Sequence, residues 1–307
     1  MKRLARWLLL GCAVCSVACE PGLTVPIDAA LAVGTSKRFT ITDDCNRSSC
    51  DNAAIVEIVE VVVDEPSIVG ASDFGTDSIL LTAYSEGSTR ITVVAADNER
   101  ELRMEEVDVE TFEIEDFQLR PVTCRHSDSG FVDLLPPEAE VTYTWSFSGP
   151  DGEPLEGDAV LDGGGLVEIS YEPESSRITY QTPPGQAAYQ ITSPASPDPL
   201  RTVQTYVDAD IDAMQVDVSP TNVSVASSSR VTIIPTIATV APCLEELERS
   251  IVVTTPTICS LDSELEVAEA STTDVDFRIY GREAGTCQFE VTFAANLVSQ
   301  TAAVQFE

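Results

Sequence analysis

A single histidine limits the acid–base chemistry that this chain of 307 residues could perform. It is His126, in the segment Cys124-Arg125-His126-Ser127-Asp128. A nucleophilic site of the Ser/His/Asp or Cys/His type needs such a base oriented beside the nucleophile. The Ser, Asp and Gly residues around His126 are instead typical of an exposed loop, and we expect Cys124 to be oxidised. We therefore expect no catalytic residues, and the chain is predicted not to be an enzyme.

Closely spaced carboxylates offer a second kind of chemistry, metal binding. Asp208, Asp210 and Asp212 alternate along the chain at a predicted domain boundary. In an extended strand they would share one face, about 6.5–7 Å apart, and Ca²⁺ prefers several oxygen ligands. The three residues are a candidate calcium site, and a solvated acidic strand face is the alternative. Zinc-type spacing of Cys and His does not occur after residue 19, so we expect no other cofactor.

The net charge excludes one class of partner. The chain carries 51 acidic and 17 basic side chains, a formal charge of −34. A field of this sign repels nucleic acid and anionic lipid headgroups. So many acids also guarantee close carboxylate pairs, and with aromatic residues at only 6% we do not interpret such pairs as a glycosidase site.

The N-terminal residues predict export. A basic segment, 1–6, precedes an apolar or small segment, 7–18, which is too short to span a bilayer as a helix. The pattern resembles a bacterial lipoprotein signal, and the resemblance implies that Cys19 becomes the lipidated N-terminus. Ser16 stands where that signal usually has Leu, Val or Ile, so ordinary cleavage after Ala18 is the alternative. Glu20 after Cys19, in place of Asp, favours the outer membrane.

The rest of the sequence predicts an all-β chain. After Leu23 it consists of short alternating or β-branched runs separated by turn residues, and it lacks a sustained helical period. Three blocks of sequence occur twice in the same order, which predicts two copies of one unit, the first ending near residue 110. The matched blocks are 33–41 with 225–233, 62–69 with 252–259, and Ala83–Val93 with Ile279–Val291 with small gaps.

These blocks resemble bacterial immunoglobulin-like domains of the group-2 type. The residues that carry the resemblance are Asp64-Glu65-Pro66-Ser67-Ile68-Val69 and Glu86-Gly87-Ser88-Thr89-Arg90-Ile91-Thr92-Val93. Pro66 and Gly87 mark turns, and Ile91 and Val93 alternate with polar residues as a half-buried strand requires. The resemblance implies β-sandwiches in both copies.

The intervening segment fits a third sandwich of about 100 residues. Val141, Tyr143, Trp145 and Phe147 alternate along 141–147, which resembles the central immunoglobulin-like strand whose Trp fills the core. The predicted organisation is a signal peptide at 1–18 and sandwiches at 19–110, 111–211 and 212–307.

Cysteine parity agrees with export. Of nine Cys, Cys12 and Cys15 lie in the predicted signal, and lipidation of Cys19 leaves six, enough for three disulfides in an oxidising compartment. Six cysteines allow 15 pairings. Cys45 with Cys50 closes a short loop, Cys259 and Cys287 lie in one copy of the repeat, and Cys124 with Cys243 is left by elimination.

Together these features predict a non-enzymatic, lipid-anchored protein of the cell envelope, in the outer membrane and facing the periplasm or the outside. Its three sandwiches would serve display, adhesion or spacing through loops or edge strands. The alternative is a module that binds a carbohydrate or cell-wall ligand, with calcium assisting. The expected partners are the membrane, through the lipid on Cys19, and a protein or glycan ligand.

Overall fold

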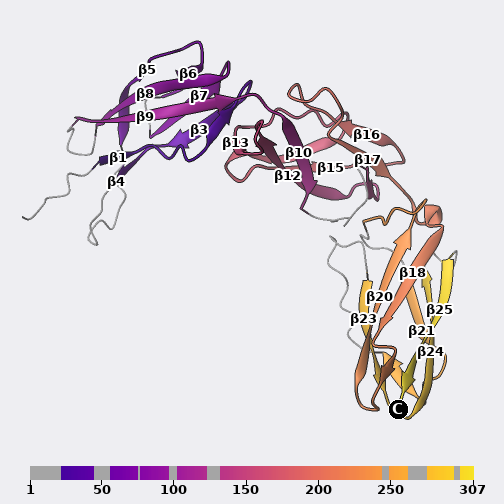
Figure 1. Ribbon diagram of the computed structural model, residues 1–307. Coiled ribbons are helices and arrows are strands. Elements are labelled where there is room, and N and C mark those ends of the chain that lie inside the picture. The colour runs from indigo at the N-terminus through magenta and orange to yellow at the C-terminus, as the bar shows by residue number, and fades with distance from the viewer. Residues whose placement is uncertain are drawn as a thin grey trace, which may run out of the picture. The chain divides into compact units, whose positions relative to one another are not determined.

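The structure is a computed structural model that describes residues 22–44, 56–74, 77–96, 102–122, 132–243, 249–261, 275–293 and 298–307. These residues form β-strands and two 3₁₀ turns, η1 (Pro173–Ser175) and η2 (Asp208–Asp210) (Figure 1). The prediction of an all-β chain is confirmed. Within the described ranges, no helix is long and apolar enough to cross a membrane.

The described residues divide into two compact units. The first holds the residues up to Asp28 together with Ser36–Thr111, and the second holds Ala29–Thr35 together with the residues from Phe112 onward. The second unit contains two separate hydrophobic cores. The first unit ends one residue from the predicted boundary at 110, while the division into three domains stays a prediction.

The first unit is a sandwich of two layers, each of three antiparallel strands, with a short additional pair of strands. Ile91, Val93 and Ala95 point inward from one sheet, and Ile79 and Leu81 from the other, and all five are fully buried. The strands are β5 (Glu57–Val63), β8 (Gly87–Ala96) and β9 (Leu102–Phe112) in one sheet, β3 (Ser36–Thr40), β7 (Ser78–Ala83) and β6 (Val69–Ser72) in the other, and the pair β1 (Gly22–Thr24) and β4 (Thr42–Asp44).

The first part of the second unit is another sandwich, centred on β12 (Glu140–Ser148). Val141, Tyr143, Trp145 and Phe147 all face its core, as the alternation predicts. One sheet holds β10 (Asp116–Pro121), β12, β13 (Pro154–Glu156), β15 (Arg177–Gln181) and β14 (Val167–Glu172), and the other holds β11 (Val132–Leu135), β17 (Arg201–Thr205) and β16 (Ala188–Ile191).

A short N-terminal strand joins this sandwich. β2 (Ala30–Ala32) pairs in parallel with β13, Ala30 opposite Leu155, and the Val33 amide donates to the Phe112 carbonyl at 2.9 Å. Ala29–Thr35 therefore belongs to the second unit, although the predicted range 19–110 places it in the first sandwich.

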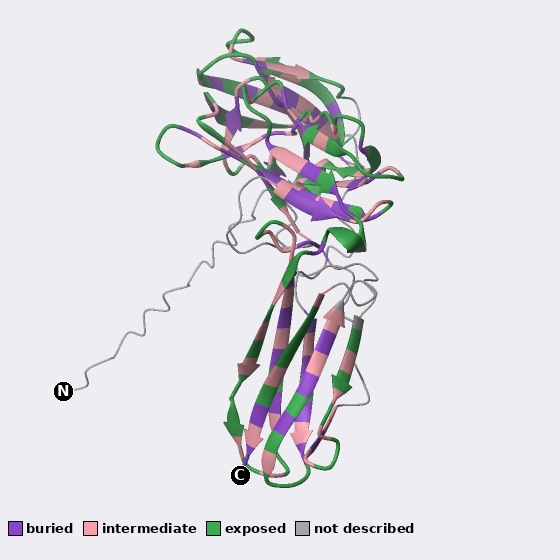
Figure 2. Ribbon diagram, turned by 90° about the vertical axis from the view of Figure 1, so that its right-hand side faces the viewer, coloured by how far each residue is buried: buried purple, intermediate pink, exposed green. Residues whose placement is uncertain are grey.

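The C-terminal part of the second unit has its own core and two four-stranded sheets. Buried and exposed residues alternate along its strands (Figure 2). The sheets are β18 (Ala213–Ser219), β20 (Ser228–Thr236), β23 (Val275–Gly281) and β22 (Cys259–Leu261), and β19 (Asn222–Val223), β25 (Val298–Phe306), β24 (Gly285–Phe293) and β21 (Arg249–Val253).

The internal repeat is visible in the strand order. β3–β7–β6 recurs as β20–β23–β22, and β5–β8–β9 recurs as β21–β24–β25. Gly87 and Gly285 open equivalent strands with φ of 150° and 146°. Both φ values favour glycine, and in both copies a Cβ would also meet the tip of an isoleucine side chain, Ile68 at 2.8 Å and Ile258 at 2.9 Å.

The start of one block of the predicted alignment is shifted by two residues. Val69 lies opposite Ala83, and Cys259 lies opposite Gly281, so Ala83 corresponds to Gly281 and not to Ile279. Strand pairing fixes this equivalence, whereas the sequence match of Tyr84 with Tyr280 is coincidental.

Candidate binding sites

Several predicted site residues lie outside the described ranges. These are Cys19, Cys45, Cys50, Cys124 and His126. Lipidation of Cys19, the Cys45–Cys50 disulfide and the interpretation of His126 as a loop residue therefore stay predictions.

A disulfide joins Cys259 and Cys287 in the C-terminal sandwich. The two residues are 28 apart in sequence, their Cα atoms are 5.7 Å apart, and both are fully buried. Cys259 lies on β22 and Cys287 on β24, so the bond links the two sheets across the core. The equivalent positions of the first copy hold Val69 and Thr89, which are also buried.

Cys243 is disulfide-bonded as well. Its amide donates to the Leu134 carbonyl at 2.8 Å, and its carbonyl accepts from the Tyr206 hydroxyl. Cys243 thus packs into the core centred on β12. Its disulfide partner lies outside the described residues, so the pairing with Cys124 stays a prediction.

The structure corrects the geometry expected for the three aspartates at 208, 210 and 212. Asp208–Asp210 is the 3₁₀ turn η2 and not an extended strand. The Asp210 carboxylate accepts hydrogen bonds from the Val207 amide and the Gln186 side chain, while the Asp212 carboxylate accepts from the Ala238 amide. Asp210 and Asp212 therefore serve local backbone and side-chain donors. Among the described residues no group of three acids, His or Cys could hold a metal.

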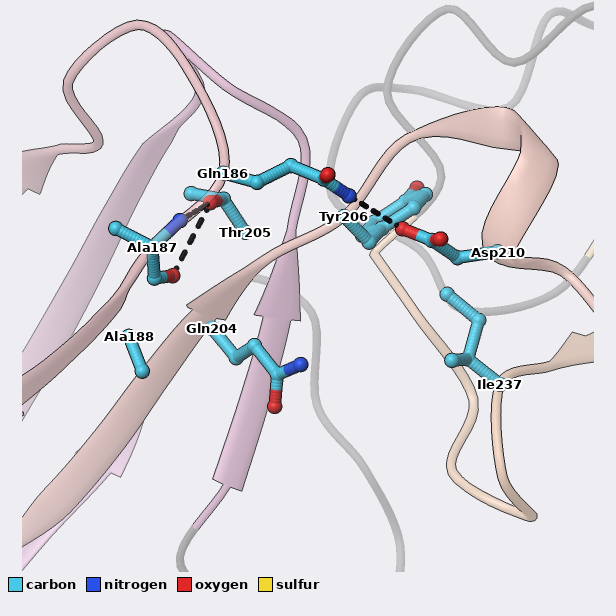
Figure 3. A pocket seen from close by; sticks show the side chains of 8 residues that line it. All are labelled: Gln186, Ala187, Ala188, Gln204, Thr205, Tyr206, Asp210 and Ile237. Carbon is cyan, nitrogen blue, oxygen red and sulfur yellow. Dashed lines mark hydrogen bonds between the residues drawn. The ribbon is translucent and has the colours of Figure 1, made fainter.

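The same turn borders a hollow of about 580 Å³ in the second unit (Figure 3). The Gln186 side-chain amide donates a hydrogen bond to the Asp210 carboxylate at 2.7 Å. The Thr205 hydroxyl accepts a hydrogen bond from the Ala187 amide and donates one to the Ala187 carbonyl. The polar atoms at the wall are thus largely occupied by one another. Its lining residues are Gln186, Ala187, Ala188, Gln204, Thr205, Tyr206, Asp210 and Ile237. The hydrogen bonds at its wall hold the side chains of Gln186, Thr205 and Asp210 in place.

A buried polar network crosses the sandwich centred on β12. The Tyr143 hydroxyl donates to Asp133 at 2.8 Å, and Arg201 donates to both oxygens of the same carboxylate at 3.0 and 3.2 Å. Burial, and then the Asp133 charge and hydrogen bond, hold the pKa of Tyr143 well above its ordinary value. The alternation along 141–147 predicts that Tyr143 points inward, but sequence gives no signal for its partners on β11 and β17.

Aromatic side chains gather beside this network. The Trp145 ring stacks on Tyr171 with centroids 5.3 Å apart, and its indole NH donates to the Gly157 carbonyl at 3.1 Å. Burial first, and nearby carboxylates second, raise the pKa of Tyr171 and of Tyr180 to about 12. The Tyr180 hydroxyl is buried, and no hydrogen-bond partner for it occurs in the structure described. Trp145 and Tyr180 are buried in the core, while Tyr171 is 38% exposed at its edge.

Two exposed aromatic side chains of the first unit, Tyr84 and Phe74, do not form a shared stacking surface for a sugar. Tyr84 lies over Gly70, whose partner is Thr82, and Phe74 lies beyond the other end of β6. The aromatic platform that would support glycan binding is therefore not assembled from these residues.

The comparisons with known proteins find similarity among solved structures alone. No family model and no curated protein matches the chain. The Escherichia coli adhesin FdeC is 13% identical, with a TM-score of 0.27, over 94% of this chain and 96% of that one. Invasin, a bacterial integrin-binding protein, is 14% identical, with a TM-score of 0.25, over 94% and 60%.

Domains 5–6 of the S-layer protein SbsC are 14% identical, with a TM-score of 0.28, over 61% of this chain and 98% of that one. Similarity at this level carries no argument about function. The fold follows from the strand pairing itself: antiparallel sheets face each other across cores of alternating inward residues, with the Trp145 strand central in one sandwich and an inter-sheet disulfide in another. The chain is built of immunoglobulin-like β-sandwiches.

Proposed function

We propose that this chain is an exported, lipid-anchored protein of the cell envelope whose immunoglobulin-like sandwiches form a non-enzymatic module for display, adhesion or spacing. The state of the cysteines carries this proposal. Three cysteines lie in the described ranges, and all three are disulfide-bonded: Cys243, Cys259 and Cys287. Structural disulfides persist in oxidising compartments and are rare in the cytosol.

Cysteine parity connects the disulfides to the anchor. Loss of residues 1–18 leaves seven cysteines, and three disulfides use six of them. Cys19 is then the odd thiol, and it stands where a lipoprotein signal places the modified residue. A thioether-linked lipid would hold the acidic chain at a membrane surface without a spanning helix. Glu20 favours the outer membrane as that surface.

Membrane fractionation of a bacterial host that expresses the full chain tests the anchor. We expect the wild-type chain in the membrane fraction and the Cys19→Ser variant in the soluble extracytoplasmic fraction. Ser16→Leu is the matched control, because it restores the usual residue of the signal and should increase the anchored fraction. Equal membrane association of the wild type and Cys19→Ser would contradict the proposal.

Protease treatment of intact cells then separates surface display from a periplasmic role. Digestion of the anchored chain in intact cells is expected for display or adhesion. Protection until the outer membrane is permeabilised would instead support a spacer on the periplasmic side.

A further inference from the structure

The strands β5, β8 and β9 lie side by side in the first unit (Figure 1). Their outer face carries apolar side chains that are exposed to solvent. Strand pairing sets its rows: Glu60, Val94 and Met104 lie side by side, and Ala96 lies beside Leu102. Leu102 is 66% exposed and Met104 is 62% exposed. Two further exposed valines lie on β5. We call the six apolar residues the outer patch: Val59, Val62, Val94, Ala96, Leu102 and Met104.

The sandwich itself does not require these residues. In the C-terminal copy the row equivalent to Glu60, Val94 and Met104 is Ser250, Thr292 and Ser299. The Ser299 hydroxyl donates to Glu290 at 3.1 Å, so that row is hydrogen-bonded and polar. The same strands thus fold with this row polar, while Val252 keeps an exposed valine at the position equivalent to Val62. The apolar side chains of Val94 and Met104 are specific to the first copy, and clustered exposed apolar residues mark interaction sites more often than they serve folding.

Carboxylates border the outer patch, and their negative charge determines which charge a binding partner should carry. Glu57 and Glu60 lie on β5 beside Ala96 and Val94, and both are exposed. Glu106 on β9 completes the border, and its contact with Arg90, at 3.4 Å, is exposed to solvent and therefore weak. A second copy of this chain would bring its own net charge of −34 to the surface, which repels it. Charge complementarity therefore favours a cationic partner.

We propose that the outer patch is a docking surface for a protein segment whose exposed apolar side chains are flanked by Lys or Arg. The inference rests on the proposed binding role of the sandwiches and names the surface and the partner chemistry. Leu102 and Met104 supply the apolar contact area, and Met104 is unbranched and adapts its shape to a partner. Glu57, Glu60 and Glu106 pair with the flanking cations and guide association.

Methionine methyl groups report on the patch directly. The chain contains three Met, of which Met104 lies in the patch and Met214 lies on β18 of the second unit. The probe is a short peptide of alternating Leu and Lys, added to the full chain with isotopically labelled methionine methyls. We expect the NMR signal of Met104 to shift with saturation while Met214 does not. A Leu/Glu peptide should leave both signals unchanged, and an all-Lys peptide should bind without selectivity for Met104.

Two variants separate the apolar contact from the charge, with the affinity of the Leu/Lys peptide measured by fluorescence anisotropy. Val94→Thr/Met104→Ser carries the residues of the C-terminal copy, and we expect affinity to fall at least about tenfold with unchanged melting temperature. Glu57→Gln/Glu60→Gln should weaken binding about threefold to tenfold and flatten its salt dependence. Val252→Ser, at the exposed valine equivalent to Val62, is the control and should bind as the wild type does.

Three results would overturn the inference: equal shifts of Met104 and Met214, an all-Lys peptide that binds as tightly as Leu/Lys, or unchanged affinity in Val94→Thr/Met104→Ser. Concentration-dependent dimerisation of the wild type that this double variant abolishes would identify a second copy as the occupant and also overturn it. The peptide measurement needs no membrane, so its failure is distinguishable from a failure of lipid anchoring.

Discussion

Two buried tyrosine hydroxyls in one core have opposite hydrogen-bonding status. Tyr143 donates to the Asp133 carboxylate, while the hydroxyl of Tyr180 is buried without a partner in the described structure. Tyr143→Phe leaves a buried carboxylate with one donor fewer, and we expect a loss of about 1–3 kcal/mol in the free energy of unfolding. Tyr180→Phe removes an unsatisfied hydroxyl, so stability should stay unchanged or rise.

Urea unfolding monitored by Trp145 fluorescence compares the two variants in the same sandwich. A larger loss for Tyr180→Phe than for Tyr143→Phe would contradict the assigned network.

Alkaline pH should destabilise the same sandwich. Burial raises the pKa of Tyr171 and of Tyr180 to about 12, above the ordinary value of about 10. Because the unfolded chain releases these protons first, their contribution is full below about pH 10 and is lost as pH rises toward 12. We expect the part of the tyrosinate absorbance that a Tyr171→Phe/Tyr180→Phe variant lacks to rise together with the loss of native Trp145 fluorescence in that window. If that part instead appeared near pH 10 with the fold intact, these two hydroxyls would be accessible.

At the level of single residues, sequence predicts which face a side chain occupies but not what it meets there. Alternation places Tyr143 and Trp145 inward, because the period of a strand is local. The Asp133–Arg201 pair that receives Tyr143 comes from two other strands, and only sheet pairing brings it there. The same limit explains why the position of Asp210 was not predicted. Its carboxylate accepts hydrogen bonds from the Gln186 side chain and the Val207 amide and does not lie on a strand face.

At the scale of the elements, the first copy of the repeat shows how the sandwich folds without the inter-sheet disulfide of the C-terminal copy. The double variant Cys259→Val/Cys287→Thr carries the residues found at Val69 and Thr89, which fill the equivalent core positions without a bond. The cross-link closes a loop with a sequence separation of 28, so we expect its loss to cost about 3–4 kcal/mol while the sandwich still folds.

Differential scanning calorimetry under non-reducing conditions measures this loss, and the disulfide at Cys243 is left intact as the reference. An unchanged transition in the double variant would show that the cross-link adds nothing to the native fold.

The sequence predicts where most strands lie along the chain, but it predicts only in part which strands pair with each other. The repeated blocks predict the strands of both copies because each block contains an alternating run, and most of them contain a turn glycine or proline as well. The third block is shifted by two residues only at its start, because gaps in the match leave the register of Ala83 open. The pairing of Ala83 with Val69 fixes that register. The parallel pairing of β2 with β13 has no local signal, since three apolar residues fit many partners.

For the whole molecule, a net charge of −34 should oppose compaction. The Debye length falls from about 30 Å at 0.01 M salt to about 8 Å at 0.15 M, so added salt screens much of the repulsion. We expect the melting temperature to rise over this range equally in NaCl and KCl and then to level off. A flat profile would mean that the acids are too dispersed to matter, and a rise confined to Ca²⁺ would point to a calcium site.

The central claim, an exported and lipid-anchored disulfide protein, is tested most directly by intact-mass spectrometry of the chain isolated from a bacterial membrane, with and without a thiol-reactive reagent. The account predicts a chain that begins at Cys19, carries the mass of a lipid on that residue and has no free thiol, because the other six cysteines are paired. An unmodified Cys19 with one reactive thiol, or a chain that retains residues 1–18, would contradict it.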